Sequence, residues 1–295
     1  MKKELLIASA LTASFGLANV AEAGANVSYS GSVTRGVTQD DVGGAAASGH
    51  TAVTTGELSF AIDQTTDSGT KWSTSLSVVD EGSAEGDPGG LTLTFTDGST
   101  LDLIEAGSAF GGAIASIPAA GGSQGITNTS TNSAPGDLDW ADASDAVGFD
   151  WGSAADFGGI DGLTVGAGYG EVEQIHSEGN IDEQTIYATY AVGALTVGVQ
   201  ISEEDTGNST GTVGYNNEFV GVTYQINDDF SVGFQAADNE HDKTGTDVTS
   251  EFRGWSAAYS MGALGVKFKR NEGRDINGTA ATDDTSTEVS VSLAF

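Results

Sequence analysis

The sequence of 295 residues has no cysteine, only 3 prolines and few basic residues. Without cysteine there is no disulfide and no thiolate-bound metal site. Beyond the first 23 residues there is no apolar run near the roughly 18 residues that indicate a membrane-spanning helix. Lysine and arginine number 10 against 42 aspartates and glutamates, which gives a net charge of −32. A field of that sign repels nucleic acid and attracts cations, so we expect no nucleic-acid partner.

The first 23 residues have the pattern of a secretory signal peptide. Met1, Lys2 and Lys3 form a short basic start, residues 5–20 are apolar, small or weakly polar, and Ala21-Glu22-Ala23 is a small-x-small cleavage site. We therefore expect residues 1–23 to be removed and residues 24–295 to form one domain. The charges of the signal cancel, so the mature chain keeps the net charge of −32.

Beyond the signal, apolar residues alternate with small polar ones in segment after segment. The last segment shows this well, because Val289, Val291, Leu293 and Phe295 alternate with serine and alanine. A period of two is that of a strand with two unlike faces. A strand of a transmembrane barrel has such faces, one apolar toward lipid and one polar toward the lumen. A final aromatic residue suits the girdle at the membrane interface.

Fourteen such segments can be counted, an even number as expected for a bacterial single-chain barrel. They are residues 27–34, 58–63, 72–78, 91–96, 101–103, 147–151, 163–169, 186–192, 195–201, 220–226, 230–234, 255–261, 264–268 and 289–295. Because each strand signal is short, 16 strands stay open as an alternative. The predicted fold class is all-β, a transmembrane antiparallel barrel of 14–16 strands.

The connections between the segments alternate in length. Turn signals such as Asp97-Gly98, Gly193 and Gly262 join segments at one end. Loops of about 8–15 residues join them at the other end, as in outer-membrane barrels. The outlier is residues 106–145, far longer than an ordinary loop. Its first half, 107–122, is small and mildly apolar and suited to packing inside the barrel, whereas its second half carries four aspartates around Trp140.

These features together resemble the Gram-negative general porins, especially the shorter alphaproteobacterial type. The resemblance rests on the signal peptide, the terminal strand 289–295, the alternating connections and a long third external loop. It covers nearly all of the mature chain, and it is a resemblance of pattern. It implies an outer-membrane homotrimer in which the third loop folds into the barrel and its carboxylates face basic wall residues. The chain departs from the family in its few arginines and in a count below the family's usual 16 strands.

The sequence offers candidates for both sides of such a constriction. Alternation directs Asp102 inward, and it also directs Lys267 and Lys269 inward. The acidic candidates are Asp102, Glu105, Asp137, Asp139, Asp142 and Asp145, and the basic candidates are Lys267, Lys269 and Lys71. Carboxylates at a narrow point favour cations, so we expect a cation preference. Arg253 is two residues from Trp255 and therefore falls on the same lipid-facing side of its strand. We expect its side chain to snorkel at the outer interface.

Enzymatic activity and a bound cofactor are not expected. The three histidines lie far apart, and no nucleophile elbow occurs. External acidic clusters provide oxygen ligands for Ca²⁺, with Asp238, Glu240 and Asp242 as the candidates, but they lack the ordered spacing of a calcium loop. The expected partners are small hydrophilic solutes, cations, outer-membrane lipid and lipopolysaccharide. The expected location is the outer membrane of a Gram-negative bacterium.

Two alternatives to a porin stay open at this point. A non-conducting outer-membrane barrel with a structural, adhesive or receptor role would have the same strands. The long insertion, which is suited to packing inside the barrel, and the polar faces of the strands argue against it. A secreted calcium-binding β-solenoid would fit the acidity and the glycine content. It would need Gly-Gly-x-Gly-x-Asp repeats, which the sequence lacks.

Overall fold

The computed structural model describes residues 25–42, 49–79, 87–88, 91–104, 120, 147–172, 180–281 and 283–294. The predicted signal peptide and Phe295 lie outside these residues. The strands are β1 (Asn26–Val42), β2 (Gly49–Thr65), β3 (Lys71–Val79), β4 (Asp87–Pro88), β5 (Leu91–Thr94), β6 (Thr100–Ile104), β7 (Val147–Gly152), β8 (Leu163–Val172), β9 (Ile181–Val192), β10 (Leu195–Asp205), β11 (Thr212–Asn227), β12 (Phe230–Lys243), β13 (Val248–Met261), β14 (Leu264–Arg274) and β15 (Asp284–Ala294). Two 3-10 helices, η1 (Phe157–Gly159) and η2 (Ile276–Gly278), lie in connections. In the described part of the chain, no helix has the length and apolar character needed to cross a membrane.

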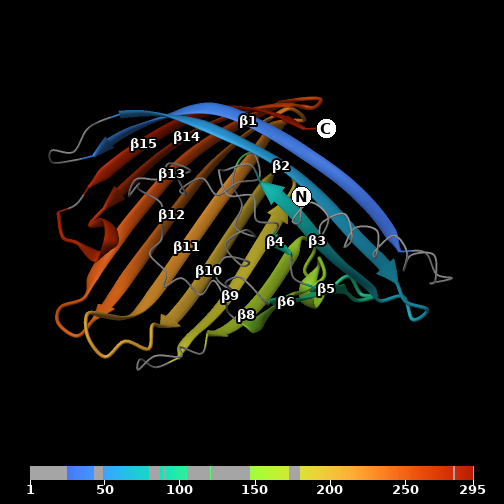
Figure 1. Ribbon diagram of the computed structural model, residues 1–295, viewed down its shortest axis with the longest axis horizontal. Helices are drawn as coiled ribbons and strands as arrows, with labels where there is room; N and C mark the ends of the chain where they lie inside the picture. The colour runs from blue at the N-terminus through green and yellow to red at the C-terminus, as the bar shows by residue number, and fades with distance from the viewer. Residues whose placement is uncertain are drawn as a thin grey trace, which may run out of the picture.

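The strands form one antiparallel sheet that closes on itself (Figure 1). β1 pairs with both β15 and β2, and β2 also pairs with β3, which completes the ring. β4 and β5 both pair with β3, at Leu76↔Pro88 and Trp72↔Leu93, so they share one place. The 15 described strands therefore fill 14 places around the barrel. This confirms the predicted fold class and the count of 14.

Short turns join the strands at one end of the barrel, where the sequence predicts them. Gly98, Gly193 and Gly262 adopt φ angles of 90°, 56° and 59°, in the left-handed region that favours glycine. In the turn between β5 and β6, the hydroxyl and the backbone N–H of Ser99 donate to Asp97 at 2.7 and 2.9 Å. These hydrogen bonds lower the pKa of the Asp97 carboxyl.

At the other end, several strands extend further than their alternation predicts. β12 continues to Lys243 and β13 begins at Val248, so their connection is residues 244–247 and not a loop of 8 or more. The connection 206–211 between β10 and β11 is also short. The predicted long loops are wrong at these two places. Outward Asp238 and Glu240 are as polar as inward Asn239, so the alternation disappears while the ladder continues.

The distribution of apolar and polar side chains in the barrel is the reverse of that in a soluble protein. Outward Ile186, Trp255 and Met261 are 58–59% exposed, whereas inward Gln235 and Asn239 are 0% exposed. Among the described residues, 28 large apolar side chains are exposed and only seven apolar residues are buried. A monomeric soluble protein rarely exposes a continuous apolar surface of this kind. A closed barrel in lipid does, because its backbone is hydrogen-bonded within the ring and its outer side chains contact hydrocarbon.

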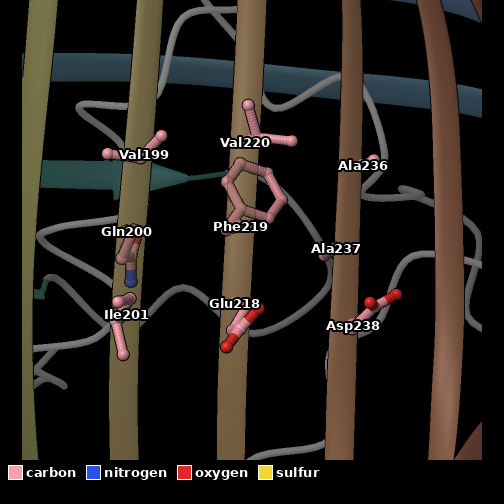
Figure 2. A pocket seen from close by; sticks show the side chains of 9 residues that line it. All are labelled: Val199, Gln200, Ile201, Glu218, Phe219, Val220, Ala236, Ala237 and Asp238. Carbon is pink, nitrogen blue, oxygen red and sulfur yellow. The ribbon is translucent and has the colours of Figure 1, made fainter.

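Carboxylates begin to replace apolar residues on the outer surface toward the long-loop end. Figure 2 shows this on β10–β12, where Val199, Val220 and Ala236 form one outward row. Two residues further along each strand, the outward row contains Ile201, Glu218 and Asp238, so carboxylates replace apolar residues on β11 and β12. These residues line a hollow beside Ala236, whose side chain is small. Six of its nine lining residues face outward, so the hollow is part of the lipid-facing wall.

Candidate pore

The lysines and arginines of the barrel lie on different faces of its wall. Lys269 is the register partner of inward Ser256 and Glu288, whereas the next residue, Arg270, is the partner of outward Trp255 and Thr287. Among the described residues, all four lysines face the lumen and all four arginines face outward; they are Lys71, Lys243, Lys267 and Lys269 inside and Arg35, Arg253, Arg270 and Arg274 outside. The predicted outward parity of Arg253 is confirmed.

One wall of the lumen carries a pair of carboxylates. Asp102 on β6 and Asp150 on β7 are register partners, and both face inward, opposite to Phe149. Asp150 is only 7% exposed. Alternation predicts the inward position of Asp102, whereas Asp150 was not among the predicted site residues. The alternation of Phe149 and Trp151 is the signal that could have found it, since Asp150 lies between them.

The opposite wall carries Lys267 and Lys269. β7 and β14 are seven places apart in a ring of 14, so the carboxylate of Asp150 and the two ammonium groups lie on opposite sides of the lumen. Lys267 is three residues after the start of β14, and Asp150 is two residues before the end of β7. Both positions are near the short-turn end of the barrel. The structure thus places Asp102, with Asp150, on the wall opposite the basic candidates Lys267 and Lys269.

Lys71 is separate from the other two basic candidates. It begins β3, which is two places from β6 and four places from β14. Its Nζ lies 3.5 Å from Oδ2 of Asp63. Lys71 therefore compensates a carboxylate on the acidic side of the ring, and the structure does not bring it together with Lys267 and Lys269.

Ala120 is the one residue of the 106–145 insertion that the structure describes, and it lies against the inner wall. Its backbone N–H donates to Oγ of Ser256 on β13 at 3.3 Å. Gly233 on the adjacent strand allows this approach, because a Cβ there would lie 3.0 Å from the Ala120 nitrogen. The other acidic candidates, Glu105, Asp137, Asp139, Asp142 and Asp145, lie outside the described residues.

An apolar patch adjoins this contact on the inner face of β11–β13. Phe219, Ala237 and Phe252 are register partners in one inward row and are only 2–3% exposed. Ala258, further along β13, is 6% exposed. A lumen lined only by water-facing residues would not have this patch, and alternation did not predict it. The patch suits contact with another apolar segment.

Gly166, Gly168 and Gly170 leave the middle of the inner face of β8 without side chains of its own. A Cβ at Gly166 would meet the Tyr187 ring at 2.1 Å, and one at Gly170 would meet Oε1 of Glu183 at 2.5 Å. Side chains from β9 therefore lie across β8. The glycines permit a close approach that any larger residue would prevent.

The proposed calcium candidates lie away from the lumen. Asp238, Glu240 and Asp242 share the outward parity of β12. In the part of the chain that the structure describes, no group of three or more histidines, cysteines, aspartates or glutamates could hold a metal ion.

Comparison with known proteins relates this fold to porins. No family model matches the chain, and no curated protein is significantly similar to it. Among solved structures, a porin refined at 1.8 Å has a TM-score of 0.61 at 15% identity, over 92% of this chain and 100% of that one. A mutant of Rh. blastica porin has a TM-score of 0.56 at 14% identity, over 92% and 100%. OmpT of Vibrio cholerae, an outer membrane protein in its trimer form, has a TM-score of 0.58 at 13% identity, over 92% and 99%. At these identities the likeness shows the fold: the chain has the fold of porins.

Proposed function

We propose that the protein is an outer-membrane porin, through which small hydrophilic solutes and ions diffuse passively with a preference for cations. It catalyses no reaction. The observation that carries the proposal is the opposition of Asp102 and Asp150 to Lys267 and Lys269 across the lumen of a barrel with an apolar exterior. Opposed charges produce a transverse field that orients polar solutes and disfavours apolar ones.

Barrel size and inner charge support conduction with cation preference. Barrels of eight strands are filled by side chains, whereas porins of about 16–18 strands leave an aqueous channel, and 14 places lie nearer the second group. Carboxylates outnumber lysines on the inner face, which favours cations. The inward carboxylates among the described residues are Asp63, Asp102, Asp150, Glu183, Glu204, Asp284 and Glu288.

The insertion 106–145 narrows the pore in this proposal. Its contact through Ala120 with Ser256 and the adjoining patch around Phe219 and Phe252 support an inward position for its apolar half. The acidic half, with Glu105 and the four aspartates of residues 137–145, then adds carboxylates to the constriction. Solutes are selected by size at this point and by the charge of its walls.

Location and assembly follow from the same proposal. The predicted signal peptide, the apolar exterior and the porin fold support a place in the outer membrane of a Gram-negative bacterium. The trimer form of a protein with this fold supports a homotrimer. The exterior then contacts outer-membrane lipid and lipopolysaccharide.

A swelling assay on liposomes tests the proposal. The purified mature protein is reconstituted, and the rate of swelling is measured in iso-osmotic solutions of neutral sugars of increasing size. We expect fast entry of monosaccharides and a rate that falls steeply with solute size. Liposomes that contain the folded barrel but do not swell in any sugar would contradict passive diffusion.

A non-conducting barrel with a structural, adhesive or receptor role is the second candidate. One observation favours it: inward Gln235, Asn239 and Ser250 are 0% exposed, as a filled lumen would make them. A porin narrowed by an inward loop buries part of its wall in the same way. The swelling assay separates the two candidates, because only an open lumen admits sugar.

A further inference from the structure

Asp102 and Asp150 stand closer together than their charges favour. As register partners in an antiparallel ladder, they have Cβ atoms about 4.5–5.5 Å apart, and like charges in that position destabilise a sheet. Because Asp150 is only 7% exposed, the surrounding medium screens the repulsion less than water does. A positive charge bound beside the pair would relieve this repulsion.

The protein wall does not supply that charge. Among the described residues, no lysine or arginine forms an ion pair with Asp102 or Asp150. Lys71, two places away from β6, lies against Asp63 at 3.5 Å. Lys267 and Lys269 are on the opposite wall. A mobile positive charge from the lumen can provide the compensation instead.

Among the residues that the structure describes, the buried carboxylate of the pair has an oxygen atom without a hydrogen-bond partner. Oδ1 of Asp150 is buried and has no hydrogen-bond partner in the described structure. The register partner of Asp150 on β8 is Gly168, which has no side chain to offer. On the other side, Thr92 is the partner of Asp102 and presents a hydroxyl on the same inner face. The row therefore combines two carboxylates and one hydroxyl, all oxygen donors.

We propose that Asp102 and Asp150 bind a hard cation on the pore wall, and that a divalent cation such as Ca²⁺ or Mg²⁺ binds there more strongly than K⁺. Carboxylate and hydroxyl oxygens are the ligands that such cations prefer. Two carboxylates match a double charge, and water from the lumen completes the coordination shell. With only two protein carboxylates, the site belongs to the class with dissociation constants of about 0.1–1 mM.

Binding at this site alters selectivity, and this consequence rests on the proposed function because it requires an open pore. A bound divalent cation cancels the charge of the acidic wall while Lys267 and Lys269 keep theirs. The permeability ratio of K⁺ to Cl⁻ should therefore fall when Ca²⁺ is added. The acidic wall then has a regulatory ligand in addition to its fixed charge.

The test measures reversal potential in a planar bilayer under a KCl gradient, with and without CaCl₂ at about 1 mM. Three variants are compared with the wild type: Asp102→Asn, Asp150→Asn and Asp182→Asn. Asp182 is the matched control, because it lies on the outward face of β9 and its change removes the same charge. We expect Ca²⁺ to lower the permeability ratio in the wild type and in Asp182→Asn, and to have little effect in the two lumen variants. An unchanged Ca²⁺ response in both lumen variants overturns the site, and so does its loss in Asp182→Asn.

A second measurement keeps the inference separate from the proposed function. Calorimetric titration of the folded protein in detergent with CaCl₂ requires no conduction. We expect Asp150→Asn and Asp102→Asn each to lose one Ca²⁺ equivalent or to bind it about tenfold more weakly, and Asp150→Glu to retain it. Identical titrations of the wild type and both asparagine variants overturn the site even if the pore conducts. A barrel that binds Ca²⁺ in this pattern but does not conduct contradicts the porin proposal alone.

Discussion

Ala120 and Ser256 are joined by a 3.3 Å hydrogen bond although they are 136 residues apart in the chain. The donor is a backbone N–H of the long insertion, and the acceptor is a hydroxyl on the inner face of β13. Gly233 on β12 makes room for this contact. The insertion thus has a fixed point on the wall, next to the strand that carries Lys267 and Lys269.

Gly233→Val should displace the insertion from that point. A Cβ at Gly233 lies 2.8 Å from Oγ of Ser256 and 3.0 Å from the Ala120 nitrogen, so the contact cannot form unchanged. Overpacking of this kind costs about 1–3 kcal/mol of stability, and we expect a larger single-channel conductance. Gly245→Ala is the control, because its Cβ would meet nothing within 4 Å. A conductance equal to that of the wild type would show that this contact does not set the pore width.

Removing the two lysines of the basic wall should increase the cation preference. Lys267→Gln with Lys269→Gln removes two positive charges from the lumen and leaves its carboxylates in place. Reversal potentials under a KCl gradient report the change. Arg270→Gln, an outward neighbour on the same strand, controls for loss of positive charge. An equal effect of the lysine and arginine variants would assign the selectivity to overall charge and not to the lumen.

Neutralising the acidic half of the insertion should decrease the cation preference. The variant combines Asp137→Asn, Asp139→Asn and Asp142→Asn. A matched control neutralises three outward carboxylates, Glu203, Glu218 and Asp238. We expect the permeability ratio of K⁺ to Cl⁻ to fall in the first variant and to stay near the wild-type value in the control. If it is unchanged in the first variant, these aspartates are not the filter.

A charge on the outer wall should destabilise the barrel more than the same charge on the inner wall. Val222 and Thr223 are neighbours on β11, and they face lipid and lumen respectively. Val222→Arg should cost about 2–4 kcal/mol if the residue lies near the bilayer midplane, and Thr223→Arg considerably less. Denaturant unfolding in lipid vesicles measures both. Equal losses would contradict the assignment of the two faces.

The sequence predicts the fold well wherever the two faces of a strand differ in polarity. Each of the 14 counted segments overlaps a strand of the barrel, although segment 91–96 extends two residues past β5 and Phe295 lies outside the described residues. The turns at Gly98, Gly193 and Gly262 are where expected. Strand ends beyond the apolar surface could not be predicted, because outward Glu240 and inward Asn239 are both polar there. Period-two patterns detect a contrast between environments, and above the lipid that contrast is lost.

The candidate site was predictable only in part. Alternation along the strands predicts that Asp102, Lys267 and Lys269 face inward. In the closed sheet, the strand of Asp102 lies on the wall opposite the strand of the two lysines. Asp150 carried the same parity signal and was missed. The contact of Ala120 with the inner wall had no signal at all, because a small residue in a long insertion has no pattern that identifies a partner 136 residues away.

The most direct test of the account is a single-channel recording of the purified mature protein in a planar bilayer under a salt gradient. We expect stepwise openings, with a reversal potential displaced toward that of the cation. Openings in groups of three would agree with a trimer. A correctly folded barrel that inserts into the bilayer and never conducts would contradict the central claim and favour the non-conducting alternative.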